Sequence, residues 1–161
     1  MAIFDTECLL KATETLFKSK LNDEITLLNT EKGDYEIEAI NSEAWYFQNL
    51  DDQVWSYGNF IVWGMYGNPT QTATQNNNSM KSTQIFFEVC LVDEGGPISE
   101  NVFYRLLRYT RALESVIHKN YDKIRSGLKV EVTSLNPTSF DLGGKTFRSA
   151  GVLITVAMST N

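Results

Sequence analysis

The chain has 161 residues and a formal net charge of −6, and 42% of its residues are hydrophobic. This composition excludes an intrinsically disordered chain, and the length predicts a single domain, residues 1–161, with its own core. No apolar run approaches the roughly 20 residues that a membrane-spanning helix needs, so we expect no membrane partner. We also expect no secretory signal, and two reduced core cysteines, Cys8 and Cys90.

The charge is unevenly divided along the chain. Residues 1–55 contain twelve acidic and four basic residues, whereas residues 56–161 contain eight acidic and ten basic residues. A solvated acidic face is the simpler interpretation of this pattern. The alternative is that the acidic half of one copy contacts a basic helix of the next copy. The overall negative charge argues against tight binding of nucleic acid, which requires many cationic contacts to phosphate.

The first quarter of the chain is predicted to contain one helix and one short strand. The spacing of apolar residues predicts a helix from Phe4 to Leu21, with Asp5 as its N-cap. Residues 22–33 are expected to be a polar connection, in which the apolar residues from 25 to 28 are candidates for a short strand. Tyr35–Ile40 alternates apolar and acidic residues, which predicts an edge strand.

An aromatic run follows. Trp45, Tyr46 and Phe47 are consecutive and lie in an acidic setting that includes Asp51 and Asp52. One interpretation is a core or lid segment packed on a sheet. The other is an anchor at an interface between subunits, because Trp, Tyr and Phe are enriched where protein surfaces meet. The two adjacent carboxylates are weak indications of acid–base chemistry, since neighbouring loop carboxylates are usually solvated.

Two strands are predicted on either side of a long polar segment. Ser56–Tyr66 is apolar on both faces, which predicts a central strand, and Thr83–Val92 alternates cleanly. Residues 67–82 between them have almost no apolar side chains, and the segment is too long for a plain hairpin turn. We expect a mobile arm or a functional loop there, ordered when a partner binds. Its candidate contact residues are Asn76, Asn77 and Asn78.

The residues from Pro97 to Asn120 form the most regular pattern in the chain. Apolar residues recur at steps of three and four, which predicts an amphipathic helix laid across the buried face of a sheet. Ser99 is the expected N-cap. The predicted apolar stripe consists of Val102, Phe103, Leu106, Leu107, Thr110, Leu113, Val116 and Ile117.

Three arginines, Arg105, Arg108 and Arg111, lie away from this apolar stripe. The simplest interpretation is a solvated face. The alternatives are a contact with carboxylates of a neighbouring subunit and a contact with phosphate. The acidity of the chain favours the first alternative over the second. His118 is the only histidine, and we expect it at the surface near the end of the helix.

Two more strands are predicted after this helix. Residues 128–133 alternate between apolar and polar side chains, and Asn136 with Pro137 is expected to end that strand. A glycine turn is predicted over Asp141–Lys145, and Phe147–Met158 is the final strand. Together the elements predict an α+β fold with a mainly antiparallel sheet of four to five strands, and with the N-terminal helix and the long helix packed on one face.

No catalytic or metal-binding motif is recognisable in the sequence. The segment Gly143-Gly144-Lys145-Thr146 is like the end of a phosphate-binding loop, but Ser139 stands where that motif requires a glycine, and a strand follows instead of a helix. A metal site needs closely spaced Cys, His or Asp ligands, which the sequence lacks. We therefore expect a non-enzymatic protein with no cofactor and no metal.

The order of the elements and several short segments resemble a known family. The segments are Tyr104-Arg105-Leu106, Leu128-Lys129-Val130, Leu135-Asn136-Pro137 and Gly151-Val152-Leu153-Ile154-Thr155-Val156. Over the last two-thirds of the chain, this pattern resembles the tail terminator proteins of tailed bacteriophages, which are also called tail completion or neck proteins.

The resemblance implies a protein of the virion that is made in the host cytoplasm. Its copies would form a ring, typically a hexamer, that caps the tail tube and joins it to the head–tail connector or stopper protein. DNA would pass through the ring without specific binding. The acidic half and the basic helix would supply the two different surfaces that a head-to-tail ring requires. An acidic channel would not retain the passing phosphates.

Two other functions are compatible with the sequence. One is another head–tail joint protein, such as an adaptor, a stopper or a tube-associated protein. The other belongs to a different class, a small-ligand-binding or enzymatic α+β domain with a pocket between helix and sheet. The missing catalytic constellation counts against this second function.

Overall fold

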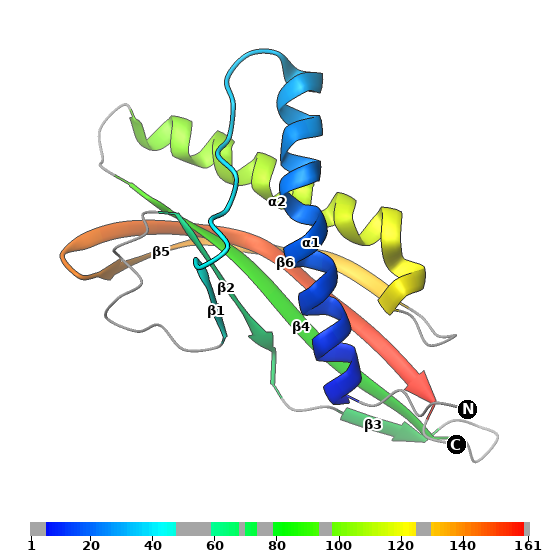
Figure 1. Ribbon diagram of the computed structural model, residues 1–161. Coiled ribbons are helices and arrows are strands. Elements are labelled where there is room, and N and C mark those ends of the chain that lie inside the picture. Colours follow the sequence, from blue (N-terminus) through cyan, green and yellow to red (C-terminus); the bar gives the residue numbers. More distant parts are fainter. Residues whose placement is uncertain are drawn as a thin grey trace.

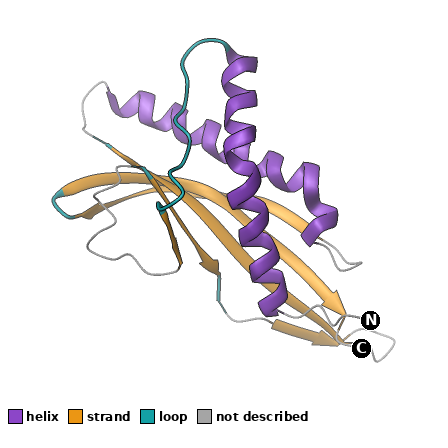
Figure 2. Ribbon diagram, in the orientation of Figure 1, coloured by secondary structure: helices purple, strands orange, loops and turns teal. Residues whose placement is uncertain are grey.

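The computed structural model describes residues 6–47, 59–67, 70–73, 79–93, 98–124 and 130–159. Within these ranges, two helices and six strands follow one another along the chain (Figures 1 and 2). The elements are α1 (Thr6–Lys32), β1 (Trp45–Phe47), β2 (Phe60–Met65), β3 (Thr70–Ala73), β4 (Ser79–Val92), α2 (Ile98–Ile124), β5 (Val130–Leu142) and β6 (Lys145–Ser159).

The strands form one mixed sheet. Five of them follow the order β1-β2-β4-β6-β5, and β3 pairs with the first residues of β4 beside this path. β1 is parallel to β2, and the other strand pairs are antiparallel. The predicted α+β fold with a mainly antiparallel sheet is therefore confirmed, with β3 as an additional short strand.

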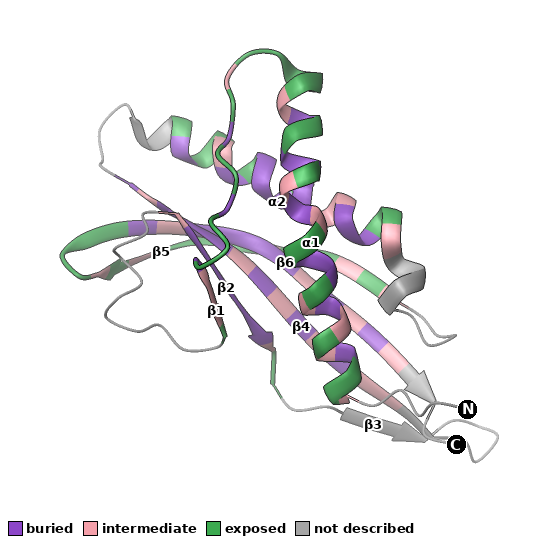
Figure 3. Cartoon of the chain, viewed as in Figure 1, coloured by how far each residue is buried: buried purple, intermediate pink, exposed green. Residues whose placement is uncertain are grey.

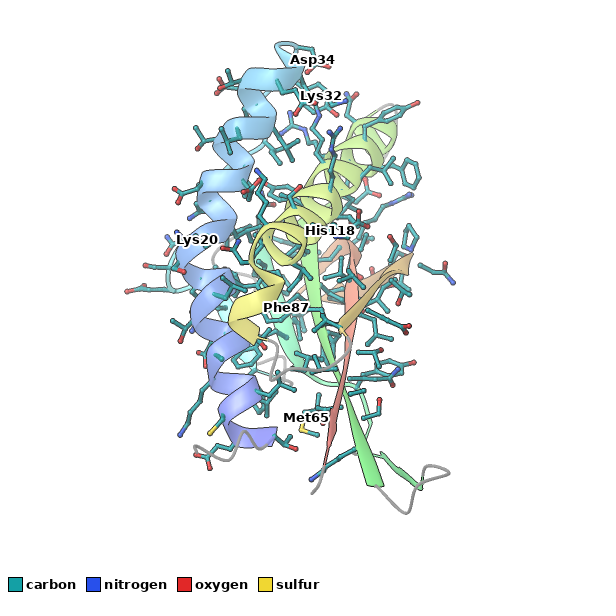
Figure 4. All side chains as sticks on the ribbon, turned by 90° about the vertical axis from the view of Figure 1, so that its right-hand side faces the viewer. Lys20, Lys32, Asp34, Met65, Phe87 and His118 are labelled. Atoms are coloured by element: carbon teal, nitrogen blue, oxygen red, sulfur yellow. The ribbon has the colours of Figure 1, made fainter. Side chains whose placement is uncertain are left out.

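Both helices lie on one face of the sheet (Figure 4). α1 contacts this face through Phe17, whose ring stacks on Phe87 of β4 at 4.1 Å between centroids. α2 crosses β4 and β6 and contacts β5, where Ser134 donates a hydrogen bond of 2.8 Å to Glu114 of α2. Phe87 and Ser134 share a face of the sheet because both pair with Val152 of β6. The main core therefore lies between the helices and this face.

Burial alternates along much of β4, whereas β2 is buried along nearly its whole length (Figure 3). The side chains of β4 that face the helices are buried, and they are Ile85, Phe87, Val89 and Leu91. A smaller aromatic cluster occupies the opposite face of the sheet. There the ring of Phe147 lies 5.2 Å from that of Phe60 and stacks on that of Phe140 at 5.5 Å, between centroids.

α1 is longer than the sequence predicted. It continues to Lys32, so the predicted connection over residues 22–33 and its short strand are wrong. The second half of α1 is polar on the side that faces solvent, but apolar residues continue at helical spacing on the side that faces the core. The buried apolar residues of this half are Leu21, Ile25 and Leu28. Gly33 ends the helix with a φ of 67° and donates its N–H to the carbonyl of Asn29 at 3.1 Å.

The segment Tyr35–Ile40 is extended but is not a strand, so that prediction is also wrong. Two side chains of α1 form four of its backbone hydrogen bonds, and side chains of α2 form others. The amide of Asn29 accepts the N–H of Ile37 at 2.8 Å and donates to its carbonyl at 2.9 Å. Asn22 binds Ile40 in the same way, at 2.9 and 3.1 Å. The two amides therefore take the place of a neighbouring strand.

The buried face of α2 is turned relative to the prediction. Tyr109 and Ala112 are buried, whereas Phe103 and Leu107 of the predicted stripe are exposed. The reason is that α2 has two packing partners. α1 covers one flank of α2, and the sheet covers the side of α2 that faces β4 and β6. Hydrophobic periodicity alone could not indicate this rotation.

Two predictions about the helices are wrong at single residues. α2 begins at Ile98, so Ser99 lies inside the first turn and is not the N-cap. Cys8 is exposed on α1 and is not a core residue, although Cys90 is buried as predicted. Phe4 and Asp5, the predicted staple and cap of α1, lie outside the described residues.

The strands also extend beyond their predicted limits. β3 and the start of β4 form a ladder inside the segment 67–82, which was predicted as one long loop. β5 continues through Pro137, because the strand accommodates the proline in a bulge between Leu135 and Thr138. The glycine turn between β5 and β6 is present, with positive φ at Gly143 and Gly144.

Candidate interface surfaces

The aromatic run forms β1 and divides between core and surface. Trp45 and Tyr46 are partly buried, and their rings contact Phe87 and Phe60 edge-on, at 6.4 and 5.9 Å between centroids. Phe47 packs against Trp63 at 4.8 Å, yet 49% of Phe47 is exposed. The core interpretation therefore holds for Trp45 and Tyr46, and the interface interpretation stays a prediction for Phe47.

Arg108 of α2 binds the segment that follows α1. Its guanidinium donates to both carboxylate oxygens of Asp34 at 2.6 and 2.8 Å and to the carbonyl of Tyr35 at 2.6 Å. It also lies 3.7 Å from the centre of the Tyr35 ring, within cation–π distance. These hydrogen bonds from Arg108 are the main reason that the pKa of Asp34 is lowered. In Figure 4, Asp34 lies just beyond the end of α1.

The other two arginines also contact their own chain. Arg105 lies over the Tyr35 ring at 5.5 Å, and Arg111 forms an ion pair of 3.2 Å with Glu31 of α1. Arg108 is buried. The predicted solvated face is therefore wrong for Arg108, and the carboxylates that Arg108 and Arg111 bind belong to the same subunit. No local pattern in the sequence indicates these partners, because Asp34 lies 74 positions away from Arg108.

The opposite flank of α2 carries exposed apolar side chains. Phe103, Tyr104 and Leu107 are 38%, 49% and 45% exposed, and we call these three residues the α2 patch. Glu114 follows Leu107 after seven positions, which places both on one side of a helix. Glu114 accepts a hydrogen bond from Ser134 of β5, so the side of α2 that carries Leu107 and Glu114 is turned toward β5. Tyr104 lies seven positions before Arg111, which binds Glu31 of α1, so Tyr104 is nearer the α1 side.

Two groups on β4, the partly buried Glu88 and the buried Cys90, have shifted pKa values. Burial raises the pKa of Glu88 on β4. Burial and the nearby Glu88 carboxylate raise the pKa of the Cys90 thiol well above its ordinary value. The two residues share the face of the sheet that is turned away from the helices, where Glu88 pairs with Val62 and Cys90 with Phe60. Both groups are therefore held in their neutral forms more strongly than in water.

Few other features resemble a ligand site. A shallow hollow along α1 is lined by Lys11, Ala12, Thr15, Leu16, Ser19 and Lys20. The described residues contain no group of three or more His, Cys, Asp or Glu side chains that could hold a metal ion. No described helix is both long enough and apolar enough to cross a membrane. His118 is exposed, as predicted.

Five predicted contact residues cannot be placed. They lie outside the described residues and are Asp51, Asp52, Asn76, Asn77 and Asn78. The structure instead exposes three apolar side chains that the sequence did not single out as contact residues, Phe103, Tyr104 and Leu107. The sequence pattern could not mark Leu107 as exposed, because its position fits the buried apolar stripe of α2 equally well.

A scan of the chain against models of protein families found no match, and a search of curated proteins found none either. The surfaces of the chain itself are therefore the basis for a functional proposal.

Proposed function

We propose that the chain is a non-enzymatic assembly subunit of a tailed-bacteriophage virion. In this role it resembles a tail terminator: copies form a ring, typically a hexamer, that caps the tail tube and joins it to the head–tail connector. The observation that carries the proposal is the presence of exposed apolar side chains on two separate elements. Phe47 lies on β1, at one end of the strand order, and the α2 patch lies on the long helix.

Two different surfaces on one subunit are what a closed ring requires. A head-to-tail contact joins one surface to another, and a suitable rotation then closes the ring. Large exposed apolar side chains favour such a contact, because aromatic residues are enriched at the centres of interfaces. The ion pair of Arg108 with Asp34 fixes α2 to the segment that follows α1, and so helps to hold the α2 patch in place.

The order of elements also supports the proposal. α1, β2, β4, α2, β5 and β6 follow one another as in the pattern on which the resemblance rests. Two departures are the absence of a strand over Tyr35–Ile40 and the presence of β3 within the polar segment. Both lie before β4, and the long helix and the closing hairpin are unaffected.

Negative-stain imaging of the purified chain with isolated tail tubes tests this function. We expect ring-shaped caps at one end of each tube. A chain that binds head connectors but leaves tubes bare would instead be another joint protein, such as an adaptor or a stopper. A monomer that binds neither object would contradict the proposal.

A further inference from the structure

Both helices lie on one side of the sheet, and we call the other side the outer face. Glu88 of β4 belongs to the outer face, because its neighbour Phe87 points toward α1 and stacks on Phe17. In the sheet, Glu88 lies between Val62 of β2 and Gly151 of β6. It therefore lies in the middle of the strand order, and its side chain is half-buried.

In the part of the chain that the structure describes, the carboxyl group of Glu88 has no counter-charge. It forms no hydrogen bond and no ion pair with any described residue. Burial raises its pKa, and no described cation is near enough to oppose this shift. Removing a carboxylate partly from water without a cation is costly, so a cation from a second molecule would be favourable beside Glu88.

Apolar side chains surround Glu88 on the outer face. Phe86 precedes it by two positions on β4, and Leu153 of β6 pairs with Phe86. Leu135 of β5 pairs with Gly151, and all three apolar side chains are partly exposed. Gly151 adds no side chain, and a Cβ at this position would collide with the backbone of β4. A partner that approaches over Gly151 would therefore meet one carboxyl group within an apolar surface.

A lysine on the helix-bearing side is the matching group. Within the described ranges, the cationic side chains that form no ion pair are Lys20, Lys32, Lys81 and Arg105. Of these, Lys20 lines the shallow hollow along α1, together with Ala12 and Leu16. Lys20 is half-buried, so it is also a charge that lies beside apolar side chains without a described counter-charge.

The other three cations match Glu88 less well. Arg105 already lies over the ring of Tyr35 at 5.5 Å. Lys32 is next to Glu31 in an acidic stretch of the chain, and Lys81 lies in the ladder between β3 and β4. Only the hollow along α1 combines a cation with apolar side chains in a concave surface among these described positions.

We propose that the outer face of one copy docks on α1 of the next copy, with Glu88 paired to Lys20. This inference rests on the proposed ring and names a contact between its copies. α1 and the outer face lie on opposite sides of the sheet (Figure 4). The contact therefore joins two different surfaces, so it can repeat from copy to copy until the ring closes.

Charge reversal in the full chain tests this contact. Lys20→Glu and Glu88→Lys each bring like charges together, so either variant alone should associate at least about tenfold more weakly than the unsubstituted chain. An equal mixture of the two variants should assemble again, because each contact between unlike variants joins one positive and one negative charge. Native mass spectrometry and sedimentation velocity measure both results.

The matched control makes the same charge changes at exposed positions. Lys32→Glu and Glu36→Lys should each associate like the unsubstituted chain. Glu88→Gln keeps the shape of the side chain and removes its charge. It should weaken association about tenfold without lowering the unfolding temperature of the subunit, because no described hydrogen bond or ion pair is lost.

Three results would overturn the contact. They are normal association of Glu88→Gln, normal association of Lys20→Glu, and a mixture of the two charge-reversed variants that does not assemble. In each case the ring proposal is unaffected, provided that the unsubstituted chain forms closed particles. If the unsubstituted chain stays a monomer with and without tail tubes, the proposed function is overturned together with the contact.

Discussion

The two flanks of α2 differ sharply although they belong to one helix. On the flank toward α1, Arg108 binds Asp34, Tyr109 donates to the carbonyl of Glu38 at 2.6 Å, and Lys119 binds Glu24 at 2.9 Å. On the other flank, the α2 patch is exposed. One flank therefore stabilises the fold, while the other is available to a second molecule. Substitutions on the first should change stability, and substitutions on the second should change assembly.

Two leucines of α2 give the largest contrast. Leu113 is fully buried under the helix, whereas Leu107 belongs to the α2 patch. Leu113→Ala should lower the free energy of unfolding by about 3 kcal/mol, because it removes buried methyl groups and leaves a cavity. Urea denaturation with an unchanged m value measures this loss. A change below about 1 kcal/mol would mean that α2 is not packed as described.

Tyr109→Phe tests the polar contacts of the same flank. The Tyr109 ring is buried, and its hydroxyl donates a hydrogen bond to the carbonyl of Glu38, in the segment that joins α1 to β1. Removing the hydroxyl alone should lower the free energy of unfolding by about 1 kcal/mol. Tyr104→Phe on the exposed flank is the matched control and should have almost no effect. Equal effects of the two substitutions would remove the distinction between the flanks.

Asp34 gives a prediction for acid conditions. Its pKa is lowered in the folded chain, chiefly by hydrogen bonds from Arg108, so the carboxylate stabilises the fold above the unfolded pKa. That contribution is lost as the pH falls through the lowered folded value, below about pH 4. Asp34→Asn should therefore be less stable than the unsubstituted chain at neutral pH, and the difference should shrink in acid. Denaturation curves that differ equally at both pH values would contradict this role.

The smallest effect on stability is expected at Leu107. Leu107→Ser removes an exposed side chain, so the free energy of unfolding should change by no more than about 0.5 kcal/mol. The same variant should associate more weakly. Thermal unfolding and native mass spectrometry on one sample measure both quantities. A large loss of stability would show that Leu107 belongs to the core and not to a contact surface.

The parts of the fold that were predictable depend on local pattern. The alternation along β4 and β6 and the glycine turn at Gly143 follow from residues close together in the chain. The second half of α1 was not predictable, because its polar surface resembles a loop. Tertiary contacts such as the ion pair of Glu24 with Lys119 hold it in place.

The candidate site was less predictable than the fold. Which side chains of α2 are exposed depends on how the helix is rotated about its axis against α1. Hydrophobic periodicity indicates that an apolar stripe exists, but it does not indicate which residues of the stripe face the core. Arg108 illustrates the limit. Its place in the sequence suggests a surface residue, yet it is buried by a carboxylate and a ring from a distant segment.

The mass of the assembled particle tests the account most directly. Native mass spectrometry of the full chain, alone and with tail tubes, should show a closed species at a small multiple of the 18.3 kDa subunit, typically six copies. A species of 18.3 kDa under both conditions would contradict a function based on contacts between copies.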